Sequence, residues 1–157
     1  MTVDLSWLAR YRSSEPHFGL ERMEALLALR GNPHLACPVI HLAGTNGKGS
    51  TLAHLRSLLE AKELRVGVFT SPYLVSFNEQ ISIDGIPISD RDVETYLSLY
   101  QELLAKNSSD QTLRGLTEFE LMTVMAFDYF AAKKPDVVVM EVGMGGRLDS
   151  TNVCQPI

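Results

Sequence analysis

Apolar residues follow two spacings along the chain, one typical of helices and the other of strands. The helical spacing predicts helices over residues 21–30, 50–62 and 91–106, and a fourth between Thr117 and Lys134. Short apolar runs predict buried strands over residues 39–43, 65–69 and 137–140. Alternation around Asp84-Gly85 predicts a hairpin over residues 81–88. Strands that alternate with helices in this order predict an α/β fold, with a mainly parallel sheet and flanking helices.

Polar residues mark the ends of these helices, and apolar residues mark their buried faces. We expect Asp90 to cap the third helix, and Thr117 to cap the fourth with Glu120 in the capping-box position. The apolar face of the second helix comprises Leu52, Leu55, Leu58 and Leu59. The core residues expected on the fourth helix are Phe119, Met122, Met125, Ala126, Tyr129 and Phe130. Ligands are expected at the carboxyl ends of the parallel strands.

The balance of residue types is that of a single globular domain. The chain has 157 residues, of which 45% are hydrophobic and 21% charged, enough for a core of its own. A formal net charge of −5 argues against a general nucleic-acid binder and against binding to anionic membranes. The two cysteines fit neither a disulfide framework nor the spacing of a zinc site. Without a signal-peptide pattern or a bilayer-spanning apolar run, we expect a cytoplasmic protein.

The first predicted strand is joined to the next helix by a glycine-rich segment, Ala43-Gly44-Thr45-Asn46-Gly47-Lys48-Gly49-Ser50-Thr51. Glycines let backbone N–H groups point at one anion, and the helix adds the positive end of its dipole. Lys48 can reach the outer phosphates of a nucleotide, and Ser50 or Thr51 can offer a hydroxyl to Mg²⁺. Leu42 and Gly49 depart from the standard phosphate-loop pattern, so an ordinary glycine-rich turn is the alternative. The order of strand, loop and helix favours phosphate binding.

An acidic residue, Glu141, closes the last predicted strand. In phosphate-loop enzymes an acid at this place holds Mg²⁺, directly or through water. A solvated acid at a strand end is the alternative reading. Ser71 follows another strand and could also be a magnesium ligand, or only part of a Ser-Pro turn. The glycines of residues 143–146 form no dinucleotide fingerprint, because Leu148 stands in the place of the third glycine.

Four motifs occur together in one order along the chain. They are Ala-Gly-Thr-Asn-Gly-Lys-Gly-Ser at 43–50, Thr-Ser-Pro-Tyr-Leu at 70–74, Thr-Glu-Phe-Glu at 117–120, and Glu-Val-Gly-Met-Gly-Gly-Arg-Leu-Asp-Ser-Thr-Asn at 141–152. The combination resembles the folylpolyglutamate synthases, including the bifunctional dihydrofolate synthase type, which belong to the Mur ligase superfamily. The resemblance implies a P-loop-containing central domain of the Mur ligase type.

The resemblance also implies a reaction and a set of site residues. The reaction is ATP-dependent ligation of L-glutamate to the carboxylate of a folate or of dihydropteroate, through an acyl phosphate, with Mg²⁺. The implied ATP-binding residues are Thr45, Asn46, Gly47, Lys48, Gly49 and Ser50. Lys48 and Glu141 are implied as catalytic, and Ser71 and Glu141 as magnesium ligands. The residues implied for the folate or pteroate are Phe18, Gly19, Leu20, Thr117, Glu118, Phe119, Glu120, Leu148, Asp149 and Ser150.

Members of this family are considerably longer than this chain. The resemblance therefore implies that residues 1–157 are a truncated N-terminal ATP-binding domain, without the C-terminal glutamate-ligase domain. We expect such a chain to lack ligase activity alone, and to self-associate through its exposed sheet edge. The full-length protein is expected to be a monomer. Its expected partners are the small molecules ATP, folate or dihydropteroate and L-glutamate, with neither nucleic acid nor membrane.

Two other functions remain open from the residues alone. A small phosphate-loop kinase or NTPase should carry mobile arginines over the phosphates. Arg114 and Arg147 are the only plausible ones past the second predicted strand, and neither lies in a basic lid. A non-catalytic nucleotide-binding module is the other possibility. Substrate-dependent ATP turnover separates the ligase from the kinase, and binding without turnover indicates the module.

Overall fold

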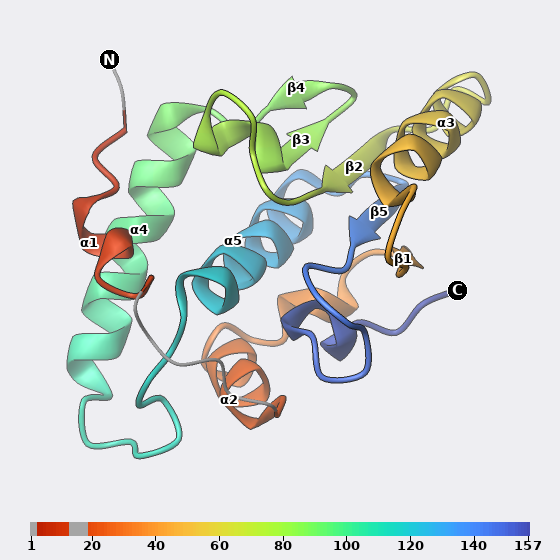
Figure 1. Cartoon of the computed structure of the whole chain (residues 1–157). Coiled ribbons are helices and arrows are strands. Elements are labelled where there is room, and N and C mark those ends of the chain that lie inside the picture. Colours follow the sequence, from red (N-terminus) through yellow and green to blue (C-terminus); the bar gives the residue numbers. More distant parts are fainter. Residues whose placement is uncertain (1–2, 13–18) are drawn as a thin grey trace.

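A five-stranded sheet crosses the protein in the order β1-β5-β2-β3-β4 (Figure 1). The computed structural model describes residues 3–12 and 19–157. The strands are β1 (Val39–Leu42), β2 (Val66–Phe69), β3 (Ile81–Ile83), β4 (Ile86–Pro87) and β5 (Val137–Glu141). The expected α/β fold is confirmed, and every predicted strand is present.

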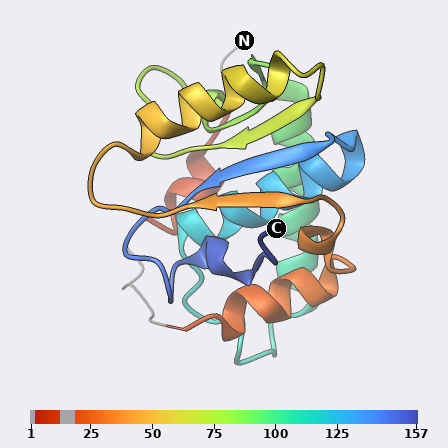
Figure 2. The same cartoon turned by 90° about the vertical axis from the view of Figure 1, so that its right-hand side faces the viewer.

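The middle of the sheet is parallel, and Figure 2 shows these strands side by side. β5 lies between β1 and β2 and pairs in parallel with both, with Val138 opposite Val39. β3 pairs antiparallel with β2 and with β4, and β3 and β4 form the predicted hairpin. Its turn residues Asp84 and Gly85 have φ values of 50° and 75°. Two positive φ values give the turn the twist that matches the flanking strands.

Helices pack on both faces of the sheet. They are α1 (Ser6–Ala9), α2 (Glu21–Leu29), α3 (Lys48–Glu60), α4 (Asp90–Lys106) and α5 (Glu118–Lys133), with 3-10 turns η1 (Pro33–Leu35), η2 (Phe77–Gln80) and η3 (Ser150–Val153). On one face, leucines of α3 pack against valines of β2 and β5. α2, α4 and α5 build a larger core on the opposite face. Within the described part of the chain, no helix is long and apolar enough to cross a membrane.

Helix α5 lies at the centre of the larger core, where every residue from Glu120 to Phe130 is buried. One of these residues is Asp128, whose Oδ2 accepts hydrogen bonds from Arg30 Nε (2.9 Å) and the Tyr100 hydroxyl (2.7 Å). Burial, together with Asp128, raises the pKa of Tyr100 well above its usual value. The buried carboxylate is therefore satisfied, and it ties α5 to α4 and to the end of α2.

Three sequence expectations need correction. Ser89 rather than Asp90 caps α4, because Ser89 Oγ accepts from the Asp92 N–H (3.1 Å) and Asp90 is already helical. α3 begins at Lys48 instead of Ser50. Leu58 is 67% exposed, because six residues carry it about 240° around the helix from buried Leu52. The short helix α1 is a further element that the pattern did not predict.

Strand β1 lies at one edge of the sheet. The last residues of the chain lie along its outer side, where Pro156 forms a parallel bridge with Val39 and the Ile157 N–H donates to the Val39 carbonyl (3.0 Å). Self-association along this edge stays a prediction.

Candidate functional site

The loop between β1 and α3 carries the predicted phosphate-binding residues. It turns at Gly47, whose φ of 78° lies in the left-handed region, and α3 begins at the next residue, Lys48. A residue with a Cβ is strained in this conformation, which explains the glycine. Residues 43–47 are exposed. The first N–H groups of α3 have no acceptor within the helix, so this end can bind phosphate oxygens.

The side chain of Lys48 bends back over its own loop. Its Nζ donates to the Gly44 carbonyl (2.9 Å) and lies 3.8 Å from Oε1 of Glu141. Glu141 is the last residue of β5, and its side chain is only 7% exposed. The other carboxylate oxygen, Oε2, accepts a hydrogen bond from the Thr70 hydroxyl. The structure thus brings together the two residues that the sequence implied as catalytic.

The order of the strands explains this meeting of distant residues. β5 lies between β1 and β2, so its carboxyl end falls between the phosphate loop and the segment Thr70-Ser71. Leu42, the last residue of β1, is opposite Glu141 in the register. The candidate site therefore occupies the carboxyl edge of the parallel strands, as expected for this class of sheet.

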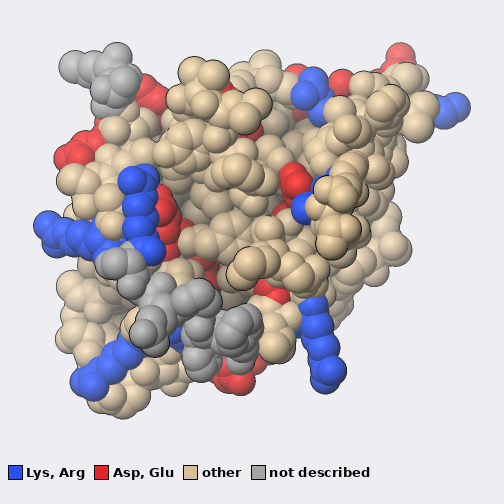
Figure 3. All heavy atoms as spheres, in the orientation of Figure 1, with Lys and Arg blue, Asp and Glu red and all other residues tan. Residues whose placement is uncertain are grey.

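A cavity of about 1020 Å³ opens beside this edge. Its lining comprises Tyr11, Arg12, Arg22, Ser71 to Tyr73, Gln80, Thr117 to Glu120, Met122 and residues 143–150. Figure 3 shows this face hollowed at its centre, with uncharged atoms on the floor and charged groups around the rim. Ser71 directly follows Thr70, and Gly143 lies two residues after Glu141, so the cavity adjoins the phosphate-binding edge. Its volume suits a small organic ligand.

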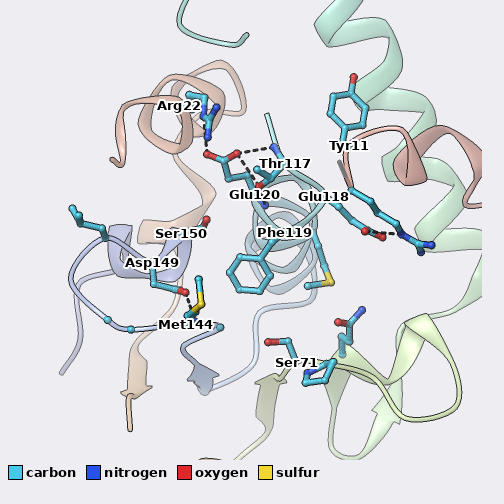
Figure 4. A pocket seen from close by; sticks show the side chains of 18 of the residues that line it. Tyr11, Arg22, Ser71, Thr117, Glu118, Phe119, Glu120, Met144, Asp149 and Ser150 are labelled. Atoms are coloured by element: carbon cyan, nitrogen blue, oxygen red, sulfur yellow. Dashed lines mark hydrogen bonds and ion pairs between the residues drawn. The ribbon is translucent and has the colours of Figure 1, made fainter. Parts of the chain in front are cut away.

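Most residues implied for a folate line this cavity. They are Thr117, Glu118, Phe119, Glu120, Leu148, Asp149 and Ser150. Gly19 and Leu20 are described but do not line it, and Phe18 lies outside the described residues. Ser71, implied as a magnesium ligand, is also part of the cavity wall (Figure 4).

The ring of Phe119 lies between Ser71 and the Met144 loop (Figure 4). It is half-buried, and its centroid is 6.0 Å from that of Phe69. The expectation of a core residue is therefore only partly right, because the ring packs on the core and also lines the cavity. A Cβ on Gly143 would lie 2.4 Å from the tip of this ring. The glycine is what lets Phe119 occupy its place.

Replacing Gly143 by alanine is expected to push the Phe119 ring toward the cavity. Overpacking of this kind destabilises a fold by about 1–3 kcal/mol. A penalty of the same size on a ligand that needs the space would lower its affinity by about 5- to 150-fold. Titration calorimetry with dihydropteroate, the ligand implied by the resemblance, measures the effect. Gly146→Ala is the matched control, because a Cβ there meets nothing within 4 Å. Equal affinities for both variants would contradict the role given to Gly143.

Glu120 is engaged by other groups of the protein. Its Oε1 accepts from Arg22 Nε (3.0 Å), and its Oε2 accepts from the backbone N–H (2.7 Å) and hydroxyl (2.9 Å) of Thr117. The predicted capping box is confirmed. Glu118, in contrast, forms a more exposed pair with Arg12 (2.8 Å) at the cavity wall. Glu120 and Thr117 therefore hold the start of α5, and a direct contact with a ligand stays a prediction for both.

Asp149 organises the loop that follows β5. Its Oδ2 accepts from the Met144 N–H (2.8 Å), and its Oδ1 accepts from the N–H (3.0 Å) and hydroxyl (2.5 Å) of Thr151. The Thr151 hydroxyl also lies 2.7 Å from Nε2 of His41 on β1. Burial lowers the pKa of His41, and the nearby Asp149 offsets part of this effect. Asp149 therefore caps the 3-10 turn η3, and a direct contact with a ligand stays a prediction.

Thr70 and Arg22 belong to the site without a role predicted from the sequence, and Gly143 was noted only among the glycines of residues 143–146. Thr70 had a usable signal, because it directly follows β2 and precedes Ser71. Arg22 resembles any charged residue of a helix surface, although it is 7% exposed. No pattern of neighbouring residues in the sequence predicts the close approach of Phe119 to Gly143.

Comparisons with known proteins agree with one another. The chain is 50% identical over 142 residues to the dihydrofolate synthase/folylpolyglutamate synthase of Bacillus subtilis (strain 168), a match covering 88% of this chain and 32% of that protein. The solved folylpolyglutamate synthase from Thermotoga maritima has a TM-score of 0.87 at 40% identity, covering 97% of this chain and 35% of that one. A solved FPGS-AMPPCP-folate complex has a TM-score of 0.86 at 38% identity, and the match covers 100% of this chain and 39% of that one. No protein-family model matches. The chain spans about a third of the length of the relatives it matches.

Proposed function

Because this chain belongs, over the length it covers, to the folylpolyglutamate and dihydrofolate synthase family, we propose that it forms part of an ATP-dependent ligase. The ligase joins L-glutamate to the carboxylate of a folate or of dihydropteroate. One observation supports this most directly. Lys48 of the glycine-rich loop lies 3.8 Å from the buried carboxylate of Glu141, and a cavity large enough for a pterin compound opens beside this edge of the sheet.

The proposed reaction needs positive charge at the carboxyl edge of the sheet. An oxygen of the folate carboxylate attacks the γ-phosphorus of ATP, and ADP leaves. Both reactants are anions, so their approach must be neutralised. Lys48 supplies a cation, and the N–H groups of residues 45–50 supply partial positive charge. The amine of L-glutamate then attacks the acyl carbon of the resulting acyl phosphate, and inorganic phosphate leaves.

The residues present fit a magnesium ion bound together with a nucleotide. In the part of the chain that is described, no three His, Cys, Asp or Glu side chains gather as a metal site. Mg²⁺ commonly takes one or two carboxylates with hydroxyls, waters and substrate phosphates. Glu141 would supply the carboxylate, and Ser71 with Ser50 or Thr51 would supply the hydroxyls expected from the sequence. Bound there, the ion would neutralise charge on the phosphates.

The cavity gives the proposed substrate an orientation. The half-buried ring of Phe119 offers a face for the flat pterin. The carboxylate of the substrate would then extend toward Lys48 and Glu141. The FPGS-AMPPCP-folate complex is a protein of this fold bound to both kinds of ligand.

The relatives are about three times as long as this chain, so we propose that residues 1–157 form part of the ATP-binding domain. Further residues would complete the glutamate site, and the chain alone is not expected to form the amide bond. The partners we propose are small molecules, without nucleic acid. Two free cysteines suit a reducing compartment such as the cytoplasm.

Titration calorimetry of the chain with Mg-ATP and, separately, with dihydropteroate tests the proposal. We expect one saturable site for each compound. Absence of binding by both would contradict the proposed function. ATP turnover without any pterin compound would instead favour the small kinase or NTPase, and binding of ATP without binding of dihydropteroate would favour a nucleotide-binding module.

A further inference from the structure

Thr70 lies where β2 meets the candidate site. It directly follows Phe69, which is opposite Met140 in the parallel register of β2 and β5, so Thr70 and Glu141 are neighbours at the sheet edge. The Thr70 N–H donates to the Gln80 carbonyl (3.0 Å), which fixes its backbone. Its hydroxyl donates to Oε2 of Glu141. A fixed backbone and a β-branched side chain leave this hydroxyl little freedom.

The two oxygens of Glu141 have different partners. Oε2 is bound by the Thr70 hydroxyl, whereas Oε1 faces Lys48 Nζ at 3.8 Å. Lys48 also donates to the Gly44 carbonyl at 2.9 Å. When Lys48 turns toward the phosphates of a nucleotide, some of these contacts change, because its ammonium group has three donors in all. The Thr70 hydroxyl can stay in place during that change.

We propose that Thr70 is a positioning residue for Glu141, an inference that rests on the proposed function. Its hydroxyl holds Oε2, keeps the carboxylate pointing toward the phosphate loop and leaves Oε1 available to a magnesium ion that arrives with the nucleotide. The side chain of a glutamate has three rotatable bonds. If it becomes ordered only when a ligand binds, the conformational entropy that it loses lowers the affinity for that ligand. Because Thr70 already orders the Glu141 side chain in the absence of a ligand, this entropy is not lost on binding. The contribution of Thr70 should therefore appear only in the magnesium-dependent part of nucleotide binding.

A merely structural role makes a different prediction. If Thr70 only satisfies a buried carboxylate, its removal lowers stability and leaves the effect of magnesium on nucleotide affinity unchanged. The two roles therefore separate when affinity for ATP is measured with and without magnesium.

The experiment compares Thr70→Val, which keeps the shape but removes the hydroxyl, with Thr70→Ser, which keeps the hydroxyl. Calorimetry gives the affinity for ATP in excess Mg²⁺ and in excess chelator, and thermal melting checks that each variant is folded. A hydrogen bond to a charged group contributes about 1.5–3 kcal/mol, so Thr70→Val should weaken Mg-ATP binding by roughly tenfold or more. Affinity for magnesium-free ATP should change by less than about twofold, and Thr70→Ser should stay within about threefold of the original chain.

Thr95→Val is the matched control. Thr95 lies on the exposed surface of α4, and its hydroxyl donates to the Arg91 carbonyl of the same helix (2.7 Å). It should bind Mg-ATP as the original chain does. If the original chain binds Mg-ATP and Thr70→Val keeps the full magnesium effect, the positioning role is overturned while the proposed function stands. If the original chain itself shows no Mg-ATP binding, the proposed function fails and this inference fails with it.

Discussion

Replacing Lys48 by alanine is expected to lower the affinity for Mg-ATP by about 100-fold or more, which corresponds to about 2.7 kcal/mol. Lys48 is the first residue of α3 and lies 3.8 Å from the Glu141 carboxylate. Its loss removes the ammonium group expected to contact the outer phosphates, and leaves a negative carboxylate facing them. Alanine is the best helix former, so α3 itself should persist. Calorimetric titration of both proteins with Mg-ATP measures the change.

Lys62→Ala is the control for this experiment, because Lys62 is an exposed lysine just beyond the other end of α3. It should bind Mg-ATP like the original chain. Unchanged binding by Lys48→Ala would mean that the glycine-rich loop is an ordinary turn. An equal loss in both variants would point to a general effect of net charge.

Glu120→Ala is expected to destabilise the protein by about 3–5 kcal/mol, because it leaves the Arg22 guanidinium buried without its partner. The side chains of Arg22 and Glu120 are only 9% and 4% exposed. The same change removes half of the capping box at the start of α5. At about 2–4 °C for each kcal/mol, the melting temperature should fall by roughly 6–20 °C. Urea and thermal unfolding measure it directly.

The adjacent Glu118→Ala provides a matched control. Glu118 and its partner Arg12 have side chains that are 22% and 51% exposed, and exposed pairs contribute about 0–1 kcal/mol. A small loss at Glu118 with a large loss at Glu120 would support the structural role of Glu120. Normal stability of Glu120→Ala combined with weak dihydropteroate binding would instead make Glu120 a ligand-binding residue.

Local chemistry was enough to predict the features that neighbouring residues determine. The Thr117–Glu120 capping box joins residues three positions apart, and the Asp84-Gly85 turn sets its own hairpin. Lys48 and Glu141 could be found because each ends a strand or begins a helix, and such ends gather at one edge of a parallel sheet. The neighbouring signal of Ser89, however, was masked by Asp90, since both are good caps.

The order of the strands could not be predicted from the local pattern of residues. The contacts that depend on this order could therefore not be predicted either. β5 inserts between β1 and β2, and only this arrangement places the Thr70 hydroxyl against Glu141. The approach of Phe119 to Gly143 likewise depends on how α5 sits on the sheet. An amphipathic pattern shows that a side chain faces inward, but not which distant residue it meets.

The hydrogen bonds around Thr151 determine which nitrogen of His41 carries a proton. The Thr151 hydroxyl has one hydrogen and gives it to Asp149 Oδ1, so toward His41 it can only accept. The neutral imidazole must therefore be the Nε2–H tautomer, with its lone pair on Nδ1. When acid adds a second proton, it goes to Nδ1, and the donor at Nε2 is unchanged. The hydrogen bond from His41 on β1 to Thr151 in the segment after β5 is therefore kept when the histidine becomes protonated.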